Sequence, residues 1–109
     1  MARVPISFEF FPPKTDEQRA QLDRTVERLK PHAPEFVSCT FGAGGSTLGP
    51  TGVTVQRLQD THGLEAVPHM TCVGGASAEI KVLLRRYRSQ GHRRIVALRG
   101  DLPSGMGNV

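Results

Sequence analysis

Long apolar runs and clustered cysteines are both missing from this sequence. None of its 109 residues belongs to an apolar stretch approaching the roughly 20 residues that span a bilayer, and the N-terminus lacks the apolar stretch of a signal peptide. The two cysteines, Cys39 and Cys72, stand apart without the spacing of a metal site. Membrane proteins and disulfide-rich secreted proteins are therefore disfavoured, and we expect a reduced, cytoplasmic protein.

Charge and composition leave the function open. The net charge of +4 suits a nucleic-acid partner, an anionic small molecule, or a piece of a protein whose acidic remainder lies elsewhere. No linker or low-complexity segment divides residues 1–109, so we expect them to belong to one domain. Residues 102–109 have the composition of a loop and directly follow a strand signal, which predicts that the chain stops within a fold.

Four apolar runs rich in strand-forming residues alternate with three stretches of helical periodicity. The predicted strands are Ile6–Phe11, Phe36–Phe41, Ala66–Cys72 and Arg94–Arg99. This alternation predicts an α/β fold with a parallel sheet, and its repeat of about 30 residues is the one a (β/α)8 barrel requires.

The three predicted helices differ in how clearly the sequence marks their ends. Thr15 caps the first helix, and Gln18 completes a capping box. The third runs from Ser77 to about Gln90 and stops at Gly91. Glycines and a proline interrupt the start of the second, so a helix is expected there only over Val55–Asp60.

Alternation along each strand separates an apolar set of side chains from a polar one. The apolar sets, expected to pack on the helices, are Ile6, Phe8 and Phe10; Val37, Cys39 and Phe41; Pro68, Met70 and Cys72; and Val96 and Leu98. The polar sets turn inward and place Glu9, Thr40, His69, Arg99 and Asp101 at the carboxyl ends of the strands. A barrel and an open doubly wound sheet both bind ligands at that end, so the pattern predicts a site under either fold.

Glu9 is the strongest single candidate for a catalytic group. It lies among Phe8, Phe10 and Phe11, where an unpaired ionised carboxylate is costly to bury. Burial by those rings would favour the neutral acid and leave a carboxyl that can donate a proton near neutrality. The alternative is a buried glutamate that is paired with an arginine or lysine for structural reasons.

The other polar residues at the strand ends also have structural explanations. Taken alone, His69 is better explained as a hydrogen-bonded core histidine than as a ligand, and Thr40 as an ordinary strand residue. Arg99 and Asp101, with Gly100 between them, either bind a ligand or form an internal salt bridge.

Two further motifs point to ligands less specifically. The glycine-rich segment Gly42–Thr47 follows a strand but matches neither the dinucleotide spacing nor the P-loop, so a tight turn explains it better than a phosphate site. The run Arg85–Arg88 resembles a nucleic-acid patch, although cations are also expected in the last turns of a helix.

Four segments together carry a resemblance to the methylenetetrahydrofolate reductases. They are Ser7–Lys14, Phe36–Thr47, Gly63–Cys72 and Ile95–Asp101, in family order and at family-like spacing over nearly the whole chain. The resemblance implies the first four βα units of a (β/α)8 barrel that binds FAD. In that family NADH or NADPH reduces FAD, and the reduced flavin converts 5,10-methylenetetrahydrofolate to 5-methyltetrahydrofolate.

The resemblance also implies roles for individual residues. Glu9 matches the general acid that helps to open the five-membered ring of the folate. Asp101 matches an aspartate near the flavin and the pterin, so both residues are expected to contact substrate. The positions expected to line the FAD site are Thr40, Phe41, His69, Arg99, Gly100 and Asp101. A homo-oligomer is expected for the full-length protein, and no nucleic-acid or membrane partner.

Two departures from the family pattern qualify these expectations. Leu48–Gly52 is apolar and flexible where the family has charged residues, and the chain ends after the fourth strand. The remaining flavin and folate contacts would then be absent, and residues 1–109 alone are expected to be inactive. Two other possibilities stay open: a non-catalytic module that binds an anionic partner, and an inert half-barrel that associates through its sheet edges.

Overall fold

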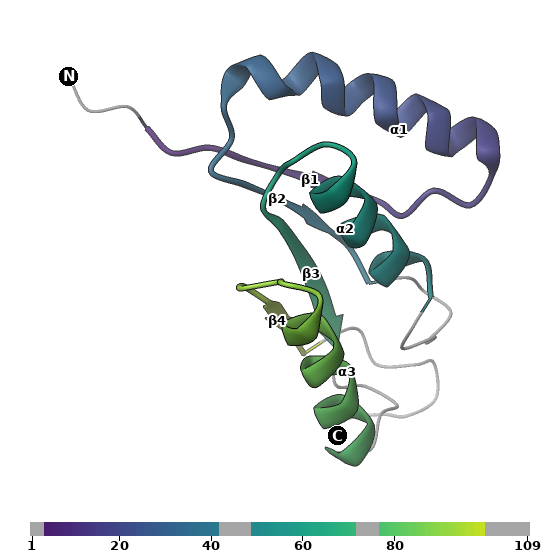
Figure 1. Ribbon diagram of the computed structural model, residues 1–109, viewed down its shortest axis with the longest axis vertical. Helices are drawn as coiled ribbons and strands as arrows, with labels where there is room; N and C mark the ends of the chain where they lie inside the picture. The colour runs from purple at the N-terminus through teal and green to yellow at the C-terminus, as the bar shows by residue number, and fades with distance from the viewer. Residues whose placement is uncertain (1–3, 42–48, 72–76, 100–109) are drawn as a thin grey trace.

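The computed structural model describes residues 4–41, 49–71 and 77–99 (Figure 1). In these ranges strands and helices alternate along the chain. The elements are β1 (Ser7–Phe10), α1 (Asp16–Leu29), the 3-10 turn η1 (Lys30–His32), β2 (Phe36–Cys39), α2 (Pro50–Asp60), β3 (Ala66–Thr71), α3 (Ser77–Ser89) and β4 (Val96–Leu98). All four predicted strands and all three predicted helices are present.

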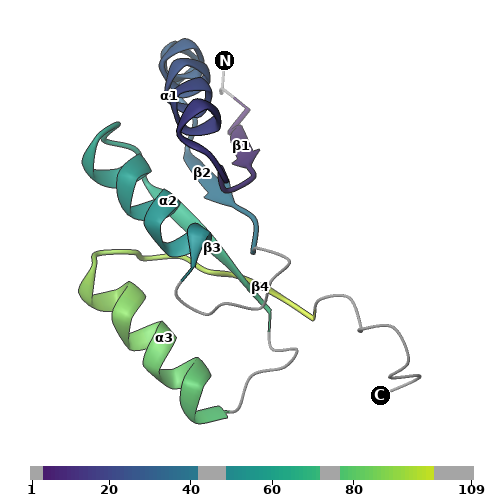
Figure 2. The same cartoon turned by 90° about the vertical axis from the view of Figure 1, so that its right-hand side faces the viewer.

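The four strands form one parallel sheet in the order β1-β2-β3-β4. Each strand pairs with the next along the chain, and the three helices lie on the same side of the sheet (Figure 2). A doubly wound sheet reverses its strand order and carries helices on both faces. The sequential order with one-sided helices is instead that of the first strands of a (β/α)8 barrel, so the predicted fold class is confirmed.

Local signals place the ends of α1 and α3 as predicted. The Thr15 side chain accepts a hydrogen bond from the Gln18 N–H at 3.0 Å. The Gln18 side chain accepts from the N–H of Lys14, one residue before the cap, at 2.8 Å. At the end of α3, Gly91 adopts φ +90°, and the His92 N–H donates to the Tyr87 carbonyl at 3.0 Å. This arrangement is a Schellman motif, which favours glycine at the left-handed position.

Helix α2 begins earlier than predicted, at Pro50 instead of Val55. Proline suits the first turn of a helix, because its missing N–H would have no partner there. Thr51, Thr54, Val55 and Leu58 are all buried on one face of the helix. Packing of this face therefore outweighs the low helix propensity of the segment.

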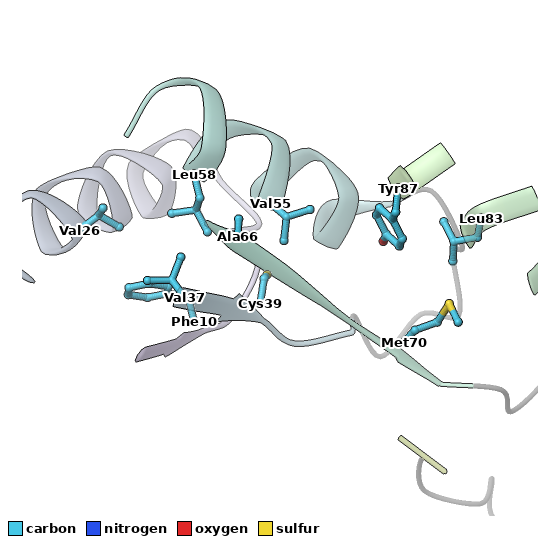
Figure 3. Packing of buried hydrophobic residues seen from close by; sticks show 10 residues of the cluster. All are labelled: Phe10, Val26, Val37, Cys39, Val55, Leu58, Ala66, Met70, Leu83 and Tyr87. Carbon is cyan, nitrogen blue, oxygen red and sulfur yellow. The ribbon is translucent and has the colours of Figure 1, made fainter. Parts of the chain in front are cut away.

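The helices and one face of the sheet enclose a single hydrophobic cluster (Figure 3). Its members are Phe10, Val26, Val37, Cys39, Val55, Leu58, Ala66, Met70, Leu83 and Tyr87. Phe8 packs against it from β1. This confirms the prediction for the helix-facing residues Phe8, Phe10, Val37, Cys39 and Met70. Of the others predicted to face the helices, Cys72 lies outside the described residues, and Ile6 and Phe41 belong neither to a strand nor to the cluster.

The prediction for β4 is wrong. Val96 pairs with His69 and Ala97 pairs with Met70. Paired residues of neighbouring strands share a face of the sheet, so Val96 lies on the face away from the helices. Ile95 packs against the hydrophobic cluster instead. The prediction assigned the inward set from Arg99 and Asp101, which lie beyond the strand, whereas the residues of β4 itself, Val96–Leu98, are all apolar and favour neither face.

Candidate functional site

The inner face, defined as the sheet face turned away from the helices, carries Glu9, Ser38, Val67 and His69. Pairing places Glu9 beside Ser38 and Ser38 beside Val67. His69 lies two residues beyond Val67, on the same face and nearer the carboxyl end of the sheet. Glu9 on β1 and His69 on β3 therefore approach each other across β2.

Glu9 and His69 are in contact. Glu9 Oε1 lies 3.3 Å from His69 Nε2. The distance is that of an ion pair, but the angle is not that of a hydrogen bond, so His69 Nε2 is a buried atom without a hydrogen-bond partner among the described residues. The sequence offered a ligand-binding histidine or a hydrogen-bonded core histidine. His69 is buried as a core histidine would be, but its Nε2 lacks the expected hydrogen bond among the described residues. The structure thus brings two of the predicted site residues together.

The predicted burial of Glu9 by three aromatic rings is wrong. The Glu9 side chain is 57% exposed. Phe8 and Phe10 belong to the opposite face of β1, and Phe11 is itself 77% exposed. Strand alternation is the reason, since neighbours in sequence point to opposite faces. The Glu9 carboxyl group therefore contacts His69 on β3 and is not enclosed by aromatic rings.

Thr40 and Phe41 follow β2 at the carboxyl end of the sheet. The Thr40 N–H donates to the Phe10 carbonyl at 2.9 Å, and the Thr40 carbonyl accepts from the Thr51 hydroxyl at 2.6 Å. These two bonds fix the backbone of Thr40 between β1 and α2. Phe41 is partly buried, and Arg99 is exposed directly after β4.

Several predicted site residues lie outside the described residues. They are Gly100 and Asp101, together with the glycine-rich segment Gly42–Thr47. Their roles stay predictions.

The described part of the site offers groups of the kind that a flavin nucleotide binds. A hydroxyl, an imidazole and a guanidinium come from Thr40, His69 and Arg99, at the ends of three successive strands. His69 Nε2 is a buried polar atom that the described residues leave without a hydrogen bond. The residues present therefore fit such a cofactor.

Cys39 does not belong to this site. Its side chain joins the hydrophobic cluster on the helix side of the sheet and is fully buried. Burial raises the pKa of its thiol to about 12. A thiol in this state is neither a nucleophile nor a metal ligand at neutral pH.

A charge network that the sequence did not predict joins α1 to α2 and to the turn that follows α2. Asp23 accepts hydrogen bonds from Arg57 at 3.0 and 2.5 Å. The two ring nitrogens of His62 lie 2.9 Å from Asp23 and 2.8 Å from Glu27. The hydrogen bonds from Arg57, helped by the one from His62, lower the pKa of Asp23 to about 2. No spacing rule connects these positions, so only the fold reveals the network.

Arg85–Arg88 does not form an aromatic platform for nucleic acid. Tyr87 is buried in the hydrophobic cluster and meets the His92 ring edge-on, with centroids 5.5 Å apart. The arginines of this run are exposed on α3. Base stacking on Tyr87 is therefore blocked, and the run is best explained as the solvated side of a helix.

Among residues 4–41, 49–71 and 77–99, no group of three or more His, Cys, Asp or Glu side chains is arranged to hold a metal ion. Over the same ranges no helix is long and apolar enough to cross a membrane.

Comparison with known proteins identifies the family. The methylenetetrahydrofolate reductase family model matches residues 1–108. The chain is 43% identical over 105 residues to 5,10-methylenetetrahydrofolate reductase of Escherichia coli, covering 96% of this chain and 36% of that protein. It is 39% identical over 103 residues to methylenetetrahydrofolate reductase (NADH) 1 of Zea mays, covering 94% of this chain and 17% of that protein. The chain thus spans about a third of the bacterial relative and a smaller share of the plant one, and it belongs to the methylenetetrahydrofolate reductase family.

Proposed function

We propose that the protein built on this sheet reduces 5,10-methylenetetrahydrofolate to 5-methyltetrahydrofolate, with FAD as cofactor and NADH or NADPH as reductant. The observation that carries the proposal is the Glu9 carboxyl group, which stands on the inner face in contact with His69. Its exposure leaves it accessible to a substrate, as a general acid must be. Family membership supplies the reaction for which such an acid is needed.

In this proposal Glu9 protonates the folate as its five-membered ring opens. FAD, when bound, supplies the hydride that completes the reduction. Thr40, Phe41, His69, Arg99, Gly100 and Asp101 would hold the cofactor, with the Arg99 guanidinium suited to anionic groups. The negative charge of Asp101 would favour a positively charged folate intermediate.

The proposal concerns a protein that carries the remaining strands of the barrel. Strands β1 and β4 have a neighbour on one side only within the described sheet. For residues 1–109 alone we expect a colourless, inactive chain that is loosely folded or self-associated. Flavin absorbance and size-exclusion chromatography after incubation with FAD measure this, and a monomer with stoichiometric FAD would contradict it. That the full-length protein is a homo-oligomer stays a prediction.

Glu9→Gln in the full-length protein tests the function itself. Reduction of the flavin by NAD(P)H should persist, because that step needs no acid. Folate reduction should fall by about 10²- to 10⁴-fold, the usual contribution of general acid catalysis. The matched control is Glu17→Gln, the same change at an exposed position of α1, which should leave both steps unchanged. Near-normal folate reduction by Glu9→Gln would remove Glu9 from this role.

A further inference from the structure

The contact between Glu9 and His69 depends on the small residue between them. Neighbouring strands lie about 4.8 Å apart, so side chains on β1 and β3 must reach over β2 to meet. Ser38 stands beside Glu9 in the register of β2 and is buried. A larger side chain at position 38 would occupy the path between the carboxyl group and the imidazole.

The two side chains differ in their access to solvent. His69 is 7% exposed, whereas Glu9 is 57% exposed. His69 Nε2 forms no hydrogen bond with the described residues, and the charged group that approaches it is the Glu9 carboxyl group, which can also meet a ligand. The buried imidazole of His69 is therefore placed to hold the exposed Glu9 carboxyl group, and Glu9 is placed to contact a substrate.

Proton placement follows from the chemistry of the two groups. An ionised carboxylate only accepts hydrogen bonds, so His69 Nε2 must carry a proton when it donates to Glu9. A protonated Glu9 can instead donate to an unprotonated Nε2. Either arrangement would place one proton between Oε1 and Nε2 and leave the second carboxyl oxygen for a ligand. In this structure the two atoms lie 3.3 Å apart without hydrogen-bond alignment, and catalytic hydrogen bonds are often poorly aligned in the absence of substrate.

Among the described residues, the strand side chains that share the inner face with this pair are uncharged. β2 brings Phe36 and Ser38, and β4 brings Val96 and Leu98. Arg99 follows β4 and is exposed. Asp101 lies outside the described residues.

We propose that His69 is the positioning residue of Glu9: it holds one carboxyl oxygen and the shared proton, so that the other oxygen faces the substrate. This role rests on the proposed function, in which Glu9 is the acid, and it is separate from any contact that His69 makes with FAD.

A double-mutant cycle in the full-length protein separates the two roles of His69. His69→Leu should slow folate reduction by about tenfold or more and move the midpoint of its pH–rate profile, because the proton partner is lost. His69→Gln keeps an N–H donor and should recover most of the rate. In a Glu9→Gln background, His69→Leu should cost little more, since it acts through Glu9. Full additivity of the two losses would overturn the proposal and assign His69 to the cofactor alone.

Histidine NMR tests the contact without any catalytic readout. Glu9→Gln should change the ring chemical shifts of His69, because it alters the group that lies 3.3 Å from Nε2. Ser38→Leu, which blocks the path, should change them likewise while both groups remain. The signals of His32, His62 and His92 are internal controls that should not move. Unchanged His69 ring signals in both variants would refute the pairing, whereas changed signals in a protein that does not reduce folate would refute only the proposed function.

Discussion

In the full-length protein, Asp23→Asn should destabilise the fold measurably, because Asp23 is the centre of the network between α1 and α2. Its carboxylate accepts two hydrogen bonds from Arg57 and lies 2.9 Å from His62. The asparagine keeps one acceptor oxygen but carries no charge. Arg57 and the buried His62 would then lose their shared anionic partner.

The size of the expected loss of folding free energy follows from the lowered pKa of Asp23. Hydrogen bonding by Arg57, partly opposed by desolvation, lowers the pKa of Asp23 from 3.8 to about 2. A difference of this size corresponds to about 2 kcal/mol of folding free energy. The side chains of Asp23 and Arg57 are 26% and 38% exposed, so solvent screens part of the interaction. We therefore expect a loss of about 1–2 kcal/mol.

Urea unfolding followed by circular dichroism at several pH values measures this loss. A carboxylate with a lowered pKa stabilises the fold above its ordinary value of 3.8, and that stabilisation disappears as the pH falls toward about 2. The difference between wild type and Asp23→Asn should thus be constant above about pH 5 and shrink below pH 4.

Asp16→Asn provides the matched control on the same helix. Asp16 pairs with Arg19 at 3.1 Å, but the two side chains are 98% and 47% exposed. Such a surface pair contributes at most about 1 kcal/mol. Equal unfolding midpoints for wild type and Asp23→Asn at pH 7 would refute the reasoning, as would a difference that does not change with pH.

Three further predictions for the full-length protein concern packing and backbone geometry. Leu58→Ala should lower the unfolding free energy by about 2–5 kcal/mol in urea titrations, because Leu58 is 1% exposed in the hydrophobic cluster. A cost below about 1 kcal/mol would argue against that packing. Gly91→Ala should cost more than Gly63→Ala in the same assay: both have positive φ, but only at Gly91 would the new Cβ crowd a side chain, at 3.1 Å from Gln59. Equal costs would show that Gln59 moves aside freely. Cys39 should resist iodoacetamide at pH 8 until urea unfolds the chain, because burial raises its pKa to about 12, and peptide mass spectrometry reports its labelling. Rapid labelling of the folded protein would contradict its burial.

The parts of the fold that were predicted correctly depend on signals a few residues long. Thr15 and Gln18 start α1, and Gly91 ends α3 with the hydrogen bonds that its position predicts. Strand alternation correctly assigned the helix-facing residues of β1, β2 and β3. The start of α2 at Pro50 was missed, since the packing that stabilises it comes from other parts of the chain.

The candidate site was likewise predicted correctly in some respects and wrongly in others. Its position at the carboxyl ends of the strands, and the choice of Glu9 and His69 as candidates, came from the sequence. The exposure of Glu9 was predicted wrongly, because neighbours in sequence were taken as neighbours in space.

What the sequence determined by itself is therefore the alternation of strands and helices, the caps, the faces of three strands and the family resemblance. Each depends on residue type at short spacing, where hydrogen bonds and periodicity act locally. Only the tertiary structure decided the face of β4, the contact of Glu9 with His69, and the network around Asp23. These depend on strand register and helix packing, which bring together residues far apart in the chain and leave no periodic trace in the sequence.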